Sequence, residues 1–150
     1  MASKWRVSTA LCALACALVL ASVAFGATVV KGGSYSGGLM PARDGVVVSF
    51  KVSANGKKVT GLSTSNLPLY CSGGGPPIPI HFKSASISGK GMFSSTGIYH
   101  VLEGPKKGQV GAKLKITGKF LKGGKEQGTL ATNYVGFANC SGKSPYSTKA

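Results

Sequence analysis

Apolar and polar residues alternate along two segments of the chain, residues 46–53 and 109–120, as in strands with one buried face. In the first segment the apolar side consists of Val46, Val48, Phe50 and Val52. In the second segment it consists of Val110, Ala112, Leu114, Ile116 and Phe120. The opposite side of that segment carries Lys113, Lys115, Thr117 and Lys119. Both segments are predicted to be antiparallel strands that cover a core on one side only.

A β-hairpin is predicted directly after the first of these strands. Asn55-Gly56 is the strongest short hairpin signal, because both residues tolerate the positive φ of a type I′ turn. A two-residue loop at this position pairs Val52 with Val59 on the apolar face. Leu62 then falls on the polar face, so we expect either a bulge at Gly61 or another segment that covers Leu62.

The rest of the chain alternates between short apolar runs and turns. The runs predict strands at 67–70, 78–82, 85–88, 92–95, 98–102, 126–133 and 146–149, the last of them at an edge. Glycine, 23 of 150 residues, helps to form the turns at 72–77, 104–108 and 122–125. Helical spacing is absent after residue 26. The fold is predicted to be all-β, a single antiparallel β-sandwich or flattened barrel of roughly seven to nine short strands.

The N-terminus has the three parts of a secretory signal. Lys4 and Arg6 precede an uncharged apolar run at residues 7–25, and small residues, Ala24 and Gly26, stand at the −3 and −1 positions of a cut before Ala27. This pattern predicts a helical signal peptide at residues 1–26 and a secreted β domain at residues 27–150. The protein is therefore expected outside the cytoplasm, either free or at the cell envelope.

Three other interpretations of the N-terminus stay open. A cut after Ala24 fits the same rule, and the apolar run is also about long enough to remain as a membrane anchor. In both cases the basic end stays in the cytoplasm and the β domain faces outward. A lipid-anchor signal at Cys16 is disfavoured, because the residues after it stay largely apolar instead of forming a polar tether.

Basic residues far outnumber acidic ones. The chain has 18 Lys and Arg against three Asp and Glu, a net charge of +15, and removal of Lys4 and Arg6 leaves about +13. Such a charge favours contact with polyanions such as nucleic acid, anionic lipid or anionic polymers of the cell envelope. It also keeps a protein soluble without any partner, so solubility alone is a sufficient explanation.

Two cysteines remain after export, Cys71 and Cys140. An even pair in an oxidising compartment predicts one disulfide. In the chain-entropy model a loop of this length stabilises a fold by roughly 4 kcal/mol. A zinc site is the weaker alternative, because it needs two further ligands and only His81 and His100 are present.

The sequence offers no clear catalytic constellation. His81 and His100 lie in predicted strands with no base–nucleophile motif around them. The three acids, Asp44, Glu103 and Glu126, lie in or beside turns and form no pair of the kind that glycosidases use or cluster that calcium requires. We expect no enzyme activity, no metal and no cofactor.

The most specific charge feature is the lysine side of residues 109–120. Side chains on one face of a strand recur about every 6.6 Å, so these lysines form a basic row. Further lysines stand at its two ends. The candidate anion-binding residues are Lys106, Lys107, Lys113, Lys115, Lys119, Lys122 and Lys125. The row suits an anionic polymer, but no aromatic side chains lie between the lysines to stack bases, so no specific nucleic-acid motif is present.

Several short motifs follow one another in a suggestive order. They are Gly33-Ser34-Tyr35-Ser36-Gly37, Val48-Ser49-Phe50-Lys51-Val52, Gly91-Met92-Phe93, Ile116-Thr117-Gly118-Lys119-Phe120, Gly128-Thr129-Leu130 and Cys140-Ser141-Gly142. In these the chain resembles a class of small secreted two-cysteine β-proteins found mainly in actinobacteria, although Tyr146 stands where the class usually has a tryptophan strand. The resemblance implies an all-β domain with its two cysteines bridged. It implies no activity, since none is established for the class.

These observations lead to one expected function and two alternatives. We expect a non-enzymatic binding or cell-surface-associated module for an anionic partner such as a cell-envelope polymer, with no membrane contact after signal cleavage. The first alternative is a structural or protein-interaction domain whose charge serves only solubility. The second is an extracellular hydrolase in which His81 or His100 lies beside a serine or an acid in a pocket.

Overall fold

The fold is a nearly closed antiparallel β-barrel. The computed structural model describes residues 28–42, 45–67, 78–135 and 141–150. Within these ranges the strands are β1 (Ser34–Leu39), β2 (Val47–Val52), β3 (Lys58–Leu67), β4 (Ile78–His81), β5 (Ala85–Ser86), β6 (Met92–His100), β7 (Val110–Phe120), β8 (Lys125–Tyr134) and β9 (Ser141–Lys149). A single 3₁₀ turn, η1 (Lys122–Gly124), joins β7 to β8. The predicted all-β class and strand number are confirmed.

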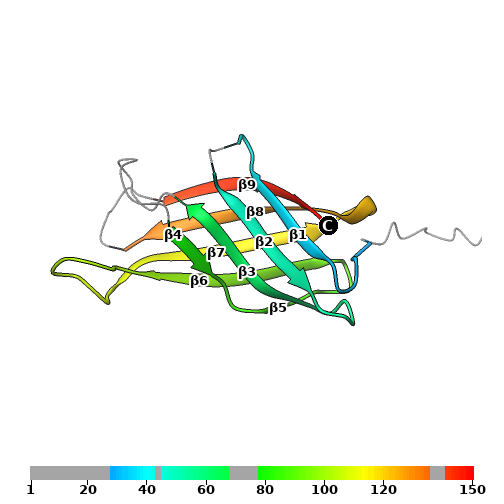
Figure 1. Ribbon diagram of the computed structural model, residues 1–150, viewed down its shortest axis with the longest axis horizontal. Helices are drawn as coiled ribbons and strands as arrows, with labels where there is room; N and C mark the ends of the chain where they lie inside the picture. The colour runs from blue at the N-terminus through cyan, green and yellow to red at the C-terminus, as the bar shows by residue number, and fades with distance from the viewer. Residues whose placement is uncertain (1–27, 43–44, 68–77, 136–140) are drawn as a thin grey trace, which may run out of the picture.

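The strands follow one another around the barrel in the order β4-β3-β2-β1-β9-β8-β7-β6, and β5 pairs with β3 (Figure 1). Every pairing is antiparallel. The two ends of this order meet where Phe82 forms a bridge with Gly97, and where the backbone N–H of Lys83 donates to the carbonyl of Thr96 at 3.1 Å. The structure thus selects the barrel from the two predicted architectures.

The last strand differs from its prediction. We expected an edge strand at residues 146–149, but β9 spans Ser141–Lys149 and lies between β8 and β1. The sequence hid its length because Gly142, Ser144 and Pro145 weaken the strand pattern. β9 joins the first strand of the chain to the later hairpins, so the barrel depends on it.

β6 also differs from its prediction, which divided it into strands at 92–95 and 98–102. The structure has one continuous strand, Met92–His100. A Cβ at Gly97 would lie 3.0 Å from the ring of Phe82 and 3.1 Å from the carbonyl oxygen of His81. The glycine therefore marks a close approach of two backbones at the seam of the barrel, and it does not break the strand.

For the hairpin between β2 and β3, the predicted strand pairing is confirmed, but the predicted two-residue turn is wrong. Val52 pairs with Val59, as predicted, but the loop has four residues, since the N–H of Ser53 donates to Lys58. The side chain of Asn55 accepts bonds from Ser53 Oγ at 2.7 Å and from the Lys57 N–H at 3.0 Å, which holds this wider loop together.

The predicted bulge in β3 is confirmed. The register between β2 and β3 shifts between Ser49 and Lys51, and Gly61 has a φ of +59°. The extra residue turns Leu62 inward, where it is fully buried.

Aromatic rings fill one part of the barrel interior. Tyr35 and Phe50 stack with centroids 4.9 Å apart, and Phe120 meets Tyr35 edge-on at 5.3 Å. Phe93 packs against both Phe50 and Phe120, at 5.5 and 5.7 Å. The four rings come from β1, β2, β6 and β7, so this cluster fastens together strands that are distant in sequence.

Glycines on β7 and β8 leave room for large neighbours inside the barrel. A Cβ on Gly118 would lie 2.1 Å from a carboxyl oxygen of Glu126 and 2.4 Å from the ring of Phe93. A Cβ on Gly128 would lie 1.9 Å from the carbonyl oxygen of Thr117 and 2.6 Å from the ring of Tyr146. Neither space admits a methyl group without movement of the backbone or the core.

Several sequence predictions lie outside the described residues. These are the signal peptide at residues 1–26, the apolar run at 67–70 beyond Leu67, the turn at 72–77 and the bridge between Cys71 and Cys140. All of them stay predictions. Among the described residues, no helix has the length and apolar character to cross a membrane.

We expect Gly118→Ala to lower the free energy of unfolding by about 1–3 kcal/mol, the usual cost of forcing a methyl group into a filled interior. Chemical denaturation followed by near-UV circular dichroism measures the change. Gly89→Ala is the matched control, because a Cβ there meets nothing within 4 Å and the residue has no positive φ. Equal stabilities of the two variants would contradict the close packing around Gly118.

Candidate functional site

The outer surface of β7 carries the lysine row that the sequence predicts. Lys113, Lys115 and Lys119 are exposed, whereas the alternate residues Ala112, Leu114, Ile116 and Phe120 are buried. The alternation follows from the pleat of the strand, which sends successive side chains to opposite faces.

Two neighbouring strands extend this row sideways. Ala131 on β8 pairs with Lys115 on one side and with Lys143 of β9 on the other. Farther along, Lys125 of β8 pairs directly with Lys149 of β9. We call these six exposed residues the basic face: Lys113, Lys115, Lys119, Lys125, Lys143 and Lys149.

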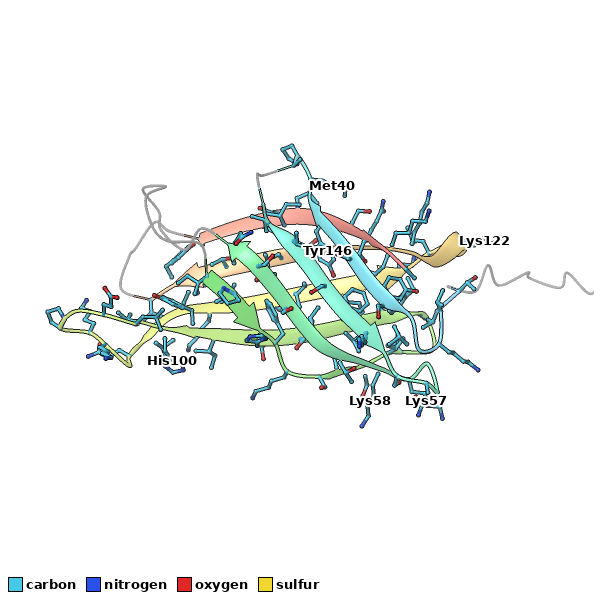
Figure 2. The ribbon with its side chains drawn as sticks, viewed as in Figure 1. Met40, Lys57, Lys58, His100, Lys122 and Tyr146 are labelled. Carbon is cyan, nitrogen blue, oxygen red and sulfur yellow. The ribbon has the colours of Figure 1, made fainter. Side chains whose placement is uncertain are left out.

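The other three predicted lysines lie beyond the ends of the row. Lys106 and Lys107 are exposed in the loop between β6 and β7, and Lys122 is exposed in η1 after β7 (Figure 2). The structure therefore brings Lys113, Lys115, Lys119 and Lys125 together on one surface. Lys106 and Lys107 stay apart from this surface, because the loop between β6 and β7 forms the far end of that hairpin (Figure 1).

The basic face is shallowly hollowed at one end. A depression of about 640 Å³ is lined by Lys113, Lys115 and Lys143, with the polar side chains of Thr96, Asn133 and Ser141 around them. Ammonium, hydroxyl and amide groups are all hydrogen-bond donors, so the lining suits an anion.

Acidic side chains are absent from the outer surface of β6–β9. Glu126 is the one acid in these strands, and its side chain is buried inside the barrel. Glu103 lies in the β6–β7 loop, and Asp44 lies outside the described residues. The lysines of the basic face therefore have no carboxylate partner within these four strands.

A buried carboxyl cluster lies on the inner side of the same strands. Glu126 is fully buried and accepts hydrogen bonds from the hydroxyl of Tyr146 at 2.8 Å and from Thr148 Oγ1 at 2.7 Å. Tyr146, labelled in Figure 2, is a buried residue of β9, the strand between β8 and β1. The backbone N–H of Lys119 also bonds to the carboxyl group. Three donors from two strands, one from β7 and two from β9, thus converge on one side chain of β8.

Burial raises the pKa of Glu126 from 4.5 to about 7, although the hydrogen bonds from Thr148, Tyr146 and Lys119 act in the opposite direction. The pKa of Tyr146 is also raised, first by burial and then by the adjacent carboxyl group. Tyr146 therefore keeps its proton and serves as a donor when Glu126 is ionised.

The geometry also accommodates the neutral acid. The Tyr146 hydroxyl lies 3.2 Å from the carbonyl oxygen of Thr117, in addition to its contact with Glu126. When Glu126 is protonated, its O–H donates to Tyr146, and Tyr146 donates onward to Thr117. Glu126 and Tyr146 therefore keep a hydrogen-bond partner in both protonation states, because the single Tyr146 proton turns from Glu126 to Thr117 when the acid is neutral.

The histidines do not form the site that the hydrolase hypothesis requires. His81 and His100 are both exposed, and His100 Nδ1 contacts the carbonyl oxygen of Gly108 at 3.0 Å. The described residues also contain no group of three or more His, Cys, Asp or Glu side chains that could hold a metal ion.

Sequence reasoning missed three residues of these sites: Glu126, Lys143 and Lys149. Glu126 begins the strand predicted at 126–133, but its inward direction is not part of that prediction; it lies four residues before the inward-facing Leu130, a spacing that also turns it inward. Lys143 lies before the part of β9 that the sequence predicts, and Lys149 lies in a strand expected at an edge, whereas β9 pairs with β8. Their alternation with Tyr146 and Thr148 was the available signal.

We expect the stability of the protein to fall as pH rises from about 4.5 to about 7, because over this range the unfolded chain releases the Glu126 proton while the folded barrel retains it. Above about pH 7, the contribution of Glu126 to the free energy of unfolding should no longer change with pH. The shift corresponds to at most about 3 kcal/mol. Thermal unfolding across this pH range measures the slope.

Two variants distinguish the source of that slope. Glu126→Gln stays neutral and should remove the contribution of Glu126. Glu103→Gln makes the same chemical change at an exposed loop position and should keep the slope. A slope that persists unchanged in Glu126→Gln would contradict the assignment.

Comparisons with known proteins give no relative for this chain. No protein-family model matches it. No curated protein and no solved structure matches it either. The resemblance to secreted two-cysteine β-proteins therefore stays a prediction from the motifs.

Proposed function

We propose that this protein is an exported, non-enzymatic module that binds an anionic partner, such as a polymer of the cell envelope, through the basic face. The observation that carries the proposal is the outer surface of β7–β9, where three adjacent strands present six lysines and no acidic side chain. Export rests on the signal pattern of residues 1–26.

The arrangement of Lys125 and Lys149 supports an anionic partner. Directly opposed like charges destabilise a pair of antiparallel strands. This pair is exposed, and a bound anion between the two ammonium groups would relieve the repulsion. The surrounding sheet fixes the backbone positions of the lysines, so only their side chains have to be ordered when a ligand binds.

A disulfide between Cys71 and Cys140 belongs to the same proposal. All pairings in the sheet order are antiparallel, so β3 and β8 run in the same direction, and their last residues, Leu67 and Tyr134, lie at the same end of the barrel. In the sequence, Cys71 follows Leu67 by four residues and Cys140 follows Tyr134 by six. A bridge there would stabilise an exported domain against unfolding.

The alternative of a structural or protein-interaction domain has less support. Such a domain needs a contiguous apolar patch on its surface. The exposed large apolar residues come from several separate elements and connections, namely Val30, Met40, Val47, Met92, Ile98, Leu102 and Val135. The lysines of the basic face, in contrast, lie on three neighbouring strands of the sheet.

The test compares two triple variants with long-chain inorganic polyphosphate as the probe. Lys113→Gln/Lys115→Gln/Lys143→Gln should weaken binding about tenfold or more and lower the slope of log affinity against log salt by about two. The control Lys51→Gln/Lys57→Gln/Lys58→Gln removes the same charge from β2, the β2–β3 loop and the start of β3, on the other side of the barrel, and should change affinity much less.

Fluorescence anisotropy at several salt concentrations gives both quantities. Absent or salt-independent binding by the unaltered protein would refute the proposal. Equal losses in the two triple variants would show that net charge alone attracts the probe, which supports the solubility alternative.

A further inference from the structure

The basic face consists of two lysine clusters separated along β7. The first comprises Lys113, Lys115 and Lys143, with Lys115 and Lys143 on either side of Ala131. The second comprises Lys119, Lys125 and Lys149; Lys119 pairs with Gln127, the next outward residue to Lys125 on β8. Each cluster therefore spans three neighbouring strands.

An uncharged row of hydroxyl groups lies between the clusters. Ser94 of β6 pairs with Thr117 of β7, and Thr117 pairs with Thr129 of β8. These residues occupy the outward level between Lys115 and Lys119. Hydroxyl groups donate hydrogen bonds to anionic oxygens without adding charge, so this row continues a donor surface from one cluster to the other.

The basic face is too long for one small anion to contact all of its lysines. The nearest members of the two clusters, Lys115 and Lys119, are four strand residues apart on β7, or about 13 Å. The backbone N–H of Leu121 donates to the carbonyl of Lys125, which places Lys125 at the level of residue 121 on β7, so the full span from Lys113 is eight strand residues, or about 27 Å. A compact ion does not cover this span, whereas a linear polymer laid along β7 does.

A second depression, of about 660 Å³, continues along the face. It is lined in part by Ser94, Thr117, Lys119 and Gln127, and so lies over the hydroxyl row and the edge of the second cluster. The first depression lies over Lys113, Lys115 and Lys143. The surface is therefore hollowed at two separate places beside β7.

The side chains of this surface suit phosphate as the anionic group. Lysine is a common ligand of phosphate, which it binds as a point charge, and the hydroxyl row adds neutral donors for phosphate oxygens. The outward positions of β6–β9 carry no Phe, Tyr or Trp to stack on a base or a sugar ring. They also carry no carboxylate to accept bonds from sugar hydroxyls.

We propose that the partner is a linear phosphodiester polymer of about five or more phosphates that lies along β7 and bridges the two clusters. It is bound through its backbone, irrespective of the groups attached to it. This inference rests on the proposed function and deepens it. Bridging makes binding of the second cluster intramolecular, so affinity should rise steeply once a chain is long enough to span both clusters.

The experiment uses fluorescent abasic oligodeoxynucleotides, which are phosphodiester chains without bases, with two to ten phosphates. We expect affinity to rise by at least about tenfold between chains shorter and longer than the span, beyond the gain from added charge. Abasic and oligothymidine chains of equal length should bind within about threefold of each other, and oligoglutamate of equal charge should bind more weakly.

Variants of each cluster test the bridge itself. Lys113→Gln/Lys115→Gln/Lys143→Gln and Lys119→Gln/Lys125→Gln/Lys149→Gln should each remove the steep rise with length while still binding short chains through the remaining cluster. Lys51→Gln/Lys57→Gln/Lys58→Gln should keep the rise. Thermal unfolding confirms that each variant is folded.

The outcomes separate this inference from the proposed function. A smooth increase with length, equal in all variants, would overturn the bridge. A strong preference for oligothymidine over abasic chains would overturn backbone recognition and indicate a nucleic acid read through its bases. Tight binding of oligoglutamate would refute the phosphate preference but leave an anionic partner. Binding to none of the probes would refute the proposed function itself.

Discussion

The fixed volume inside the closed barrel is the constraint on which the rest of the structure depends. Antiparallel strands that close on themselves leave an interior that their own side chains must fill. Rings from four strands fill one part of it, with Tyr35 and Phe50 stacked at 4.9 Å. Where Tyr146 and Glu126 also point inward, Gly118 and Gly128 have no side chain to compete with them. The size of each inward residue is therefore set by the residues opposite it.

The carboxyl cluster adds a requirement of register to this requirement of volume. Glu126 meets Tyr146 and Thr148 because β8 and β9 pair Glu126 with Thr148 and Gly128 with Tyr146. A slip of one residue in β8 would turn Glu126 outward and place Lys125 in the core. Burying an unpaired ammonium group there costs several kcal/mol. Ionisation of the buried Glu126 lowers the stability of the barrel at high pH. The position of Glu126 nevertheless favours the correct register of β8 over a register shifted by one residue.

Sequence reasoning succeeded where alternation is strong and failed where glycine, serine and proline dilute it. The inward faces of β2 and β7 were predicted correctly. Every inward position of β2 is apolar, and so is every inward position of β7 before Gly118. The bulge at Gly61 was found because an exact alternation would have exposed Leu62. β9 was foreseen only from Tyr146 onward, since its first half has no apolar residue. Closure into a barrel rests on the pairing of β9 with β1, a contact between opposite ends of the chain that no local pattern specifies.

The inner and outer faces of β7–β9 are determined by the same register, and this links the core to the proposed binding surface. The alignment that places Glu126 beside Thr148 also places Lys125 opposite Lys149. The repulsion of the two lysines cannot be relieved by a shift of the strands, because the shift would disrupt the carboxyl cluster inside. Flexible lysine heads can spread apart in water, but their backbone positions are fixed by the interior. The core therefore holds a concentration of positive charge that the outer surface alone would not favour, and the anionic polymer that we propose as partner would supply the counter-charge without any rearrangement of the sheet.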